Sequence, residues 1–460
     1  MRRAAKQLEP ILKGILMIGF SVQAVLGLWW MCANFNESQY FPEPEGMLYP
    51  VLYRMTGEIP QIIYALQLIF GCFAGRRCLV RLLPGWRAWW GSLVLLTFPM
   101  AMQCHLAVLP HSFVASLFLL ELTFAREALE EAPAGSLAKA GGCWLFLALL
   151  LPEYLYLGGV PVIFALLFLI PRYWKNRRSL SGILLIPAAF LGLILGVGSL
   201  TGQENCLSRQ SISRAFFSRA VWPTIWNDHF VWPEEIREKV EDRVWSVSFN
   251  EDHVERILQP LLEESLDGEQ ITEFYNQAAL YSWRVHGPMI LRQMVWDGLG
   301  YGVTPLLLPL QLEGRGYDAH SGRNYENMRN AHPLLTRRYV EYGCWWFGMM
   351  LVLLLLLAAV KRIGQEPAKG CPANICAPEP CEDEACRPGA GEKRRKERRL
   401  WLKTTVLYLA AAGALAAGYT LRGAGRMDYK YSVAVNELWL ILALLFLRKG
   451  KCGDREQVGE

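Results

Sequence analysis

The sequence predicts an all-α integral membrane protein, with about ten transmembrane helices and a mainly helical extracytoplasmic domain between helices seven and eight. Of the 460 residues, 53% are hydrophobic, and they gather in long runs, while polar segments keep the mean hydropathy at +0.18. A bilayer core of about 30 Å requires about 20 mostly apolar residues per helix. Long apolar runs exclude a disordered, collagenous or small disulfide-rich protein.

Ten apolar runs in the sequence are interpreted as membrane spans. Several are shorter than a full crossing, so their ends are approximate. The predicted spans are 11–32, 58–75, 88–104, 108–125, 141–157, 158–171, 180–200, 343–360, 401–420 and 434–447.

The basic residues predict which side of the membrane each segment faces, because cytoplasmic loops are enriched in Lys and Arg. With the N-terminus inside, the cytoplasmic segments hold 29 of the 47 Lys and Arg residues, the short outer loops hold four, and segment 201–343 holds 14. The first apolar run extends to Cys32 without a small-residue cleavage site, which favours a retained anchor helix over a signal peptide. We therefore expect a multi-pass protein of the cell membrane with both termini in the cytoplasm.

The spans and polar segments divide the chain into five parts. Residues 1–200 are the seven-helix membrane module, and residues 201–342 are the extracytoplasmic domain. Residues 343–360 form the eighth span, residues 361–400 a cytoplasmic linker rich in Cys, Pro and charge, and residues 401–460 the last two spans and a cytoplasmic tail.

Segment 201–342 is expected to be helical because it contains helix start signals. The sequence Trp232-Pro233-Glu234-Glu235 places proline at a first helical position with acids in the first turn. Asn250 can cap the segment that follows it. Asp267-Gly268 is expected to form a turn before a helix that continues through Tyr281.

Four cysteines lie at intervals of five in the predicted cytoplasmic linker. Four thiolates can bind Zn²⁺, but the tight CxxC pairs of zinc sites are absent here, so a low-complexity linker is preferred and no metal site is predicted. The linker ends in a basic run, which is expected to lie at the anionic inner leaflet rather than on a nucleic acid. No particular cofactor is indicated. The four cysteines are Cys371, Cys376, Cys381 and Cys386.

Carboxylates in the first outer loop are the candidates for acid–base chemistry. Glu37, Glu43 and Glu45 follow the first predicted span. A carboxylate at the membrane surface can take a proton from an acceptor hydroxyl while a sugar leaves a lipid phosphate, which is general-base catalysis. Taken alone, the segment is more simply a solvated acidic loop.

Further candidates lie in and beside the predicted spans. His105 and His111 flank a short outer turn, where they can contact an anionic substrate group, although structural hydrogen bonding is the more frequent role of such histidines. Glu121 and Glu153 lie in apolar surroundings, where an ionisable group is costly and is therefore a functional candidate. Glu153 is also close enough to a helix end to reach the interface.

Two segments and the order of the spans resemble a known family. The segments are Pro44–Tyr49, with the sequence PEGMLY, and Ala107–Leu120. Together with seven spans before a large outer loop, they resemble the GT-C glycosyltransferases, which include protein mannosyltransferases and aminoarabinose transferases. The family motif has an acidic pair, a small residue and Tyr, whereas here Pro44 replaces the first acid and one residue is inserted. The Asp that usually precedes the family's fourth helix is missing.

This resemblance implies inverting transfer of a sugar from a polyprenyl-phosphate donor to an acceptor at the outer face of the membrane. Glu45 would be the base, with Glu43 and Glu37 as substitutes, and the partners would be the lipid-linked donor and membrane lipids. The residues expected to bind the substrate are Arg54, His105, His111, Glu153, Arg214 and Arg219.

A non-catalytic polytopic membrane protein that retains a GT-C-like fold is the alternative. Transporters usually show inverted repeats, and no convincing internal repeat is present here. A non-catalytic relative, such as an envelope-assembly partner, is compatible with the two missing family acids.

Overall fold

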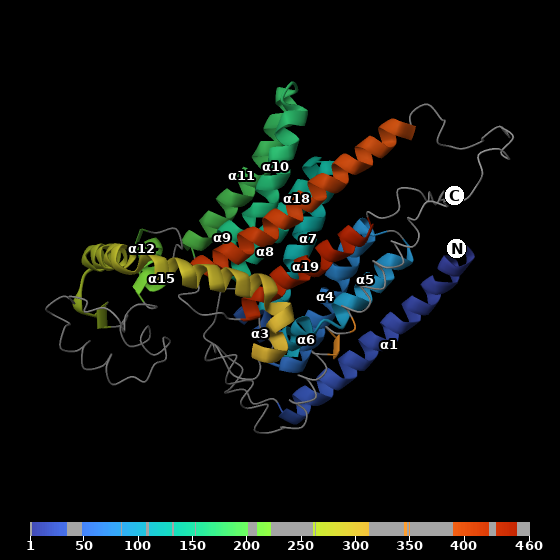
Figure 1. Ribbon diagram of the computed structural model, residues 1–460, viewed down its shortest axis with the longest axis horizontal. Helices are drawn as coiled ribbons and strands as arrows, with labels where there is room; N and C mark the ends of the chain where they lie inside the picture. The colour runs from blue at the N-terminus through green and yellow to red at the C-terminus, as the bar shows by residue number, and fades with distance from the viewer. Residues whose placement is uncertain are drawn as a thin grey trace, which may run out of the picture.

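The computed structural model is entirely α-helical in its regular elements across the residues that it describes (Figure 1). These residues are 2–34, 48–83, 85–106, 110–130, 133–151, 153–200, 209–221, 261–262, 264–311, 345–346, 349, 390–422 and 429–448. The helices are α1 (Arg2–Asn34), α3 (Leu48–Met55), α4 (Pro60–Leu82), α5 (Trp86–Leu96), α6 (Pro99–Leu106), α7 (Pro110–Glu130), α8 (Pro133–Leu150), α9 (Tyr154–Leu157), α10 (Gly159–Tyr173), α11 (Arg177–Leu200), α12 (Arg209–Val221), α15 (Gly268–Gln311), α18 (Ala390–Arg422) and α19 (Tyr429–Arg448).

Within this described part, six helical segments are long and apolar enough to cross a membrane. Each of them corresponds to one of the ten predicted spans, so the chain is a helical polytopic membrane protein. The six segments are Glu9–Trp29, Pro60–Leu82, Pro133–Leu150, Tyr154–Tyr173, Arg177–Val197 and Lys396–Thr420.

The other four predicted spans differ from a long apolar helix. Residues 88–104 fall into two short helices, α5 and α6, because the helix ends at Thr97 and a new one starts at Pro99. Helix α7 is continuous but carries charged residues in its second half. The apolar part of α19, Val433–Leu445, is short. Most of segment 343–360 lies outside the described residues.

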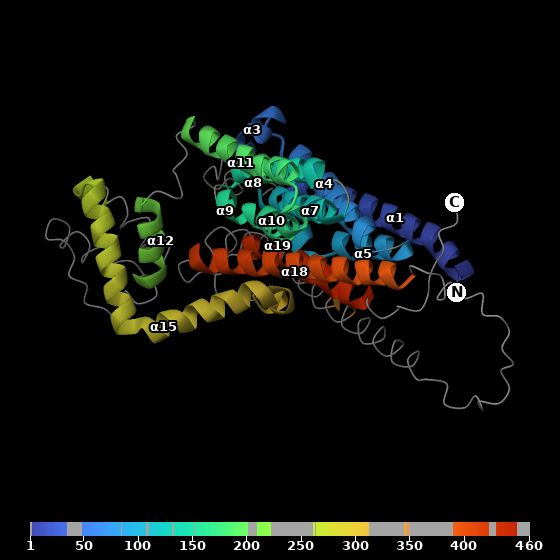
Figure 2. The ribbon, with the colours of Figure 1, turned by 90° about the horizontal axis from the view of Figure 1, so that it is seen from above.

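Helix α7 is the central helix of the bundle (Figure 2). It packs against α4, α6, α8, α10, α18 and α19, and nearly all of its side chains are buried. Its polar residues therefore face other helices rather than lipid. Glu121, the acid that the sequence singled out, has a side chain with 0% exposure.

Helix α1 lies along one side of the bundle against α4 and α5, with many of its apolar side chains exposed. At Gly27, helix α1 packs directly against the buried ring of Tyr64 from α4. The Tyr64 hydroxyl donates a hydrogen bond of 2.8 Å to the carbonyl oxygen of Gln23. A Cβ atom at position 27 would collide with this hydroxyl, so glycine is required where the two helices meet.

We expect Gly27→Ala to destabilise the protein, because the added methyl group forces Tyr64 away from α1. Overpacking of this kind costs about 1–3 kcal/mol. The matched control is Gly14→Ala on the same helix, where a Cβ meets no atom within 4 Å. Thermal unfolding of the purified protein in detergent measures both variants, and equal melting temperatures would contradict this account of the α1–α4 contact.

Helix α15 begins where the sequence predicts, but it is much longer. Asp267 caps it: its Oδ1 accepts hydrogen bonds from the backbone N–H groups of Glu269 (3.0 Å) and Gln270 (2.8 Å), and Gln270 Oε1 accepts from the backbone N–H of Asp267 (3.0 Å). The helix passes Tyr281, bends at His286 and continues to Gln311. The prediction of a helix that continues through Tyr281 is confirmed, and α15 also packs on α18 and α19.

A second, smaller core joins α12 to the first half of α15. The rings of Phe217 and Tyr275 lie 4.7 Å apart between centroids, and Ala220 and Ala279 are buried beside them. Figures 1 and 2 show α12 and the first half of α15 at one end of the molecule, away from α1. The segment predicted as a separate domain, 201–342, thus contributes its own core.

Candidate functional site

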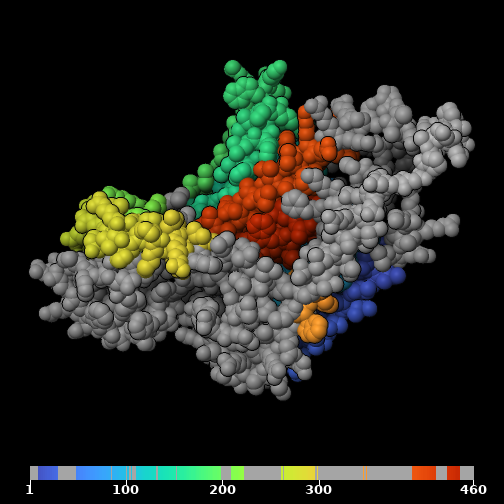
Figure 3. Space-filling model, in the orientation of Figure 1, coloured from blue at the N-terminus to red at the C-terminus, as the bar shows by residue number. Residues whose placement is uncertain are grey.

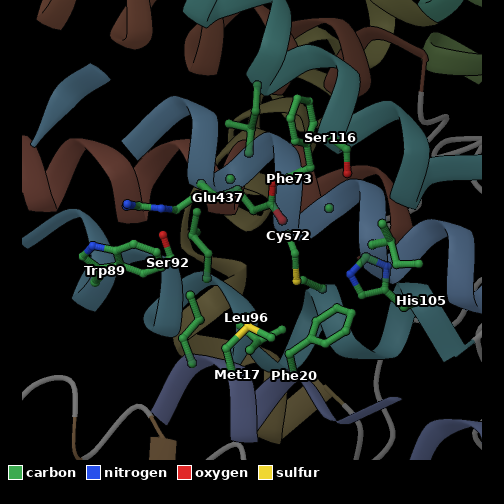
Figure 4. A pocket seen from close by; sticks show the side chains of 18 residues that line it. Met17, Phe20, Cys72, Phe73, Trp89, Ser92, Leu96, His105, Ser116 and Glu437 are labelled. Carbon is green, nitrogen blue, oxygen red and sulfur yellow. The ribbon is translucent and has the colours of Figure 1, made fainter. Parts of the chain in front are cut away.

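A cavity of about 320 Å³ lies inside the bundle between α1, α4, α5, α6, α7 and α19 (Figure 4). Apolar side chains form most of its wall, including Leu16, Met17 and Phe20 from α1 and Leu95 and Leu96 from α5. Pockets of this kind, mainly apolar with a few polar groups, are typical of ligand sites in proteins. The ionisable or hydroxyl-bearing residues on the wall are Cys72, Arg76, Ser92, His105, Ser116 and Glu437.

His105 stands at one side of the cavity, at the end of α6. Its Nδ1 lies 2.6 Å from the hydroxyl of Ser112, in the first turn of α7. A Cβ atom at Gly71 would lie 3.1 Å from the His105 ring, so the absence of a side chain there lets the imidazole approach α4. Figure 4 shows the ring turned toward the cavity. The structure therefore places His105, a residue that the sequence predicts, at the cavity. The contact with the Ser112 hydroxyl fixes its ring there.

Trp89, at the side of the cavity opposite His105 (Figure 4), is part of a network of charged and aromatic groups. The Arg76 guanidinium stacks on Trp89, with its central carbon 3.6 Å from the ring centroid. The Trp89 indole N–H donates to Glu9 at 3.2 Å, and Glu9 pairs with Lys13 at 3.1 Å. This network ties α1 to α4 and α5 beside the cavity.

Glu437 brings a carboxylate from α19 to the cavity wall and is only 9% exposed. Among the described residues, neither its Oε2 nor the Nη1 of Arg76 has a hydrogen-bond partner. An ionisable group buried in a membrane bundle is costly and is by default a functional candidate. The sequence analysis missed Glu437, although it is the one acid within the last apolar run, 434–447.

Glu121 is a second buried carboxylate, but it does not line the cavity. Neither of its oxygens has a hydrogen-bond partner in the described part of the chain. It lies within electrostatic range of Tyr154, whose hydroxyl is hydrogen-bonded to that of Tyr419. This pair of tyrosines connects α9 to α18 beside α7.

A third group of charges joins the end of α4 to α7. Glu127 accepts from Arg77 at 2.8 Å and from Arg81 at 2.7 Å. In the same helix, Arg126 pairs with Glu130 at 2.6 Å. The three arginines entered the sequence prediction only through the distribution of Lys and Arg, and neither glutamate was predicted as a site residue. The four-residue spacing of the two arginines on α4, which puts both on one face, is the signal that could have indicated a shared partner.

Arg54 and His111, two of the predicted substrate-binding residues, do not line the cavity. Arg54 is exposed at the end of α3. Helix α3 is held by two buried tyrosines. The ring centroids of Tyr49 and of Phe113 in α7 lie 6.4 Å apart, and the Tyr53 hydroxyl donates a hydrogen bond to the backbone carbonyl oxygen of Glu58 in the following turn. His111 is buried in the first turn of α7.

The other described candidates lie elsewhere. Arg214 and Arg219 belong to α12, where Arg219 is buried beside the second core, and they do not reach the cavity. Glu153 is buried where α9 begins and also lies off the cavity wall. The structure thus brings His105 to the cavity but does not gather the predicted set in one place. Glu37, Glu43 and Glu45 lie outside the described residues.

No candidate metal centre appears in the described part of the chain, where no three His, Cys, Asp or Glu side chains are grouped to hold an ion. The four linker cysteines, Cys371 to Cys386, lie outside the described residues, and their interpretation as a linker stays a prediction.

Comparison with known proteins finds no matching family model, no similar curated protein and no similar solved structure. The resemblance to the GT-C glycosyltransferases therefore rests on the sequence motifs and on the order of the spans.

Proposed function

We propose that this chain is a membrane glycosyltransferase of the GT-C type, which transfers a sugar from a polyprenyl-phosphate donor to an acceptor at the outer face of the membrane. One observation supports this most: a mainly apolar cavity within the helical bundle carries His105, a predicted donor-binding residue, on its wall. A polyprenyl phosphate has an isoprenoid chain and a charged head, so its site combines apolar enclosure with a few polar groups.

His105 is suited to bind the phosphate of the donor. When Nδ1 accepts the hydrogen bond from the Ser112 hydroxyl, the other ring nitrogen carries the proton and can donate to a phosphate oxygen. The isoprenoid chain then contacts the apolar wall formed by α1 and α5, including Phe20 and Leu96. In this arrangement, His105 binds and orients the donor, and it does not take part in the proton transfer.

The catalytic base is assigned to Glu45, with Glu43 and Glu37 as substitutes. Glu45 precedes α3 by three residues. Helix α3 is packed through Tyr49 on Phe113, two residues after His111 in α7. The end of the catalytic loop is thereby anchored to the helix that begins beside His105, which supports placing the acceptor and the donor phosphate on this side of the bundle.

The orientation of the chain follows from the same proposal. We place both termini and the linker 361–400 in the cytoplasm, and segment 201–342 outside, where it shapes the acceptor site. The distribution of Lys and Arg supports this orientation. The end of α4 with Arg76, Arg77 and Arg81 then faces the cytoplasm, and the turn after His105 faces outward.

A non-catalytic membrane protein, such as a transporter or an envelope-assembly partner, is the second candidate. It is favoured by one observation, the partly unpaired Arg76 and Glu437 on the cavity wall, because intramembrane charges of this kind mark substrate or ion pathways. The two candidates differ in turnover: the enzyme converts the donor to free polyprenyl phosphate, whereas the non-catalytic protein leaves it intact.

Filling the cavity tests whether it holds the donor lipid. We expect Leu16→Trp to weaken binding of a polyprenyl-phosphate sugar by about tenfold or more, because the larger side chain occupies the apolar wall. Ile18→Trp is the matched control, since Ile18 is on the same helix but 66% exposed and off the wall. Binding is measured by equilibrium titration of the purified variants with a labelled donor. Equal affinities of the two variants would exclude the cavity as the donor site.

A further inference from the structure

Three cations lie where α10 and α18 come together, and the residues that the structure describes supply no acidic partner for them. Arg172 is at the end of α10, and Arg399 and Lys403 lie in the first half of α18. The positive charges of Arg172 and Arg399 both act on the Lys403 ammonium, so each guanidinium lies close enough to repel that group. Among the described residues, none of the three forms an ion pair.

The described part of the chain supplies only weak compensation for this repulsion. Lys403 lies 5.4 Å above the Phe168 ring, and Arg172 lies 5.5 Å from the ring of Tyr173. Arg172 also donates a long hydrogen bond of 3.4 Å to the carbonyl oxygen of Leu129. Aromatic faces and one carbonyl carry no net negative charge, so an anion in this place would relieve the repulsion.

The position of the cluster along the helices indicates a membrane surface. Arg172 is near the end of the candidate span Tyr154–Tyr173, and Arg399 is near the start of Lys396–Thr420. Figure 3 shows the surfaces of α10 in green and α18 in orange meeting on one face of the molecule. Trp174, 68% exposed beside the cluster, is the kind of residue that anchors a protein at the headgroup level.

Apolar side chains continue from the cluster along both helices, toward the middle of the spans. Ile163 and Leu167 on α10, and Leu402, Val406 and Leu409 on α18, are all exposed. An anion without a lipid tail would leave these side chains uncovered, whereas a phospholipid places its phosphate on the cations and its acyl chains on this surface.

We propose that Arg172, Arg399 and Lys403 form a binding site for the phosphate headgroup of an anionic phospholipid, whose acyl chains lie along α10 and α18. The site is separate from the cavity, which lies between other helices, and it does not depend on the glycosyltransferase proposal. Bound lipid would join α10 to α18, two helices that are far apart in the sequence.

The test is titration of the full-length purified protein with phosphatidylglycerol, read by native mass spectrometry. The variant Arg172→Gln/Arg399→Gln/Lys403→Gln removes the three charges with little change in length. A basic residue near a membrane surface contributes about fivefold in affinity, so we expect binding to fall on the order of 100-fold. The matched control, Arg209→Gln/Arg284→Gln/Arg292→Gln, removes three exposed charges from α12 and α15 and should bind within about twofold of wild type.

Further titrations distinguish an anionic phospholipid from a zwitterionic lipid and from a free phosphate compound. Phosphatidylcholine should bind wild type far more weakly than phosphatidylglycerol, and glycerol phosphate in equal amount should not displace the lipid. Unchanged binding to the triple variant, an equal loss in the control variant, equal binding of phosphatidylcholine, or displacement by glycerol phosphate would each overturn the proposal. Thermal unfolding checks whether the triple variant is folded. If the triple variant does not fold, the single variant Lys403→Gln replaces it, and its affinity for phosphatidylglycerol is expected to fall about fivefold.

Discussion

Glu45→Gln is expected to lower the rate of sugar transfer by roughly 10²–10⁴-fold, which is the usual contribution of a general base. The substitution keeps the size of the side chain and much of its hydrogen bonding but removes the proton acceptor. Affinity for the donor should change little, because the base acts on the acceptor hydroxyl while His105 and the apolar cavity bind the donor. Release of polyprenyl phosphate and equilibrium binding of the donor are measured on the same purified samples.

Matched variants make this result specific. Glu43→Gln and Glu37→Gln test the two substitute bases, and Glu58→Gln, an exposed acid after α3, serves as the control that should retain full activity. If wild type transfers the sugar and all three loop variants remain fully active, the base lies elsewhere, with Glu153 the first residue to examine. A wild type that binds no polyprenyl-phosphate sugar would favour the non-catalytic candidate.

Glu127→Gln is expected to destabilise the protein, because Glu127 is the shared anion of two arginines on α4. Glu127 is only 8% exposed and accepts hydrogen bonds from both Arg77 and Arg81, so its loss leaves two adjacent cations without their anion. Removing one partner of a fully buried pair costs 3–5 kcal/mol, and the partial exposure of the two arginines reduces this to about 1–3 kcal/mol. Unfolding in a graded detergent titration measures the change.

Glu264→Gln is the control for this experiment. Glu264 is exposed and takes no part in the contact between α4 and α7, so its loss should change the free energy of unfolding by less than about 0.5 kcal/mol. A loss of stability for Glu264→Gln that equals or exceeds that of Glu127→Gln would show that the link from α4 to α7 contributes little. In the double variant Glu127→Gln/Arg81→Met, part of the stability should return, because one unpaired cation is removed.

The features that the sequence predicted correctly are those encoded locally. Six apolar runs became long apolar helices because the apolar residues needed to cross a bilayer are consecutive in the chain. The start of α15 was predictable because Asp267 and Gln270 lie three residues apart and satisfy the first N–H groups of the helix themselves. The full length of α15 has no such local signal, since the helix also packs on α18 and α19, which are distant in the sequence.

The cavity could not be predicted because its wall is assembled from distant parts of the chain, from Leu16 in α1 to Glu437 in α19. His105 was found by its position before Pro110, but its contact with Gly71 depends on how α4 packs against α6 and α7. Arg214 was grouped with it as a substrate-binding residue that the family resemblance implies in the large outer segment. The helix that carries Arg214 instead packs on the first half of α15.

The measurement that tests the central claim most directly is photo-crosslinking of the wild-type protein with a polyprenyl phosphate that carries a photoreactive group in its isoprenoid chain. We predict that the label maps to the cavity-facing segments Leu16–Phe20 in α1 and Gly71–Arg76 in α4, and that an unlabelled polyprenyl-phosphate sugar displaces it. Label that lies only on exposed surfaces such as α11, and that the unlabelled donor does not reduce, would contradict the assignment of the cavity to the donor lipid.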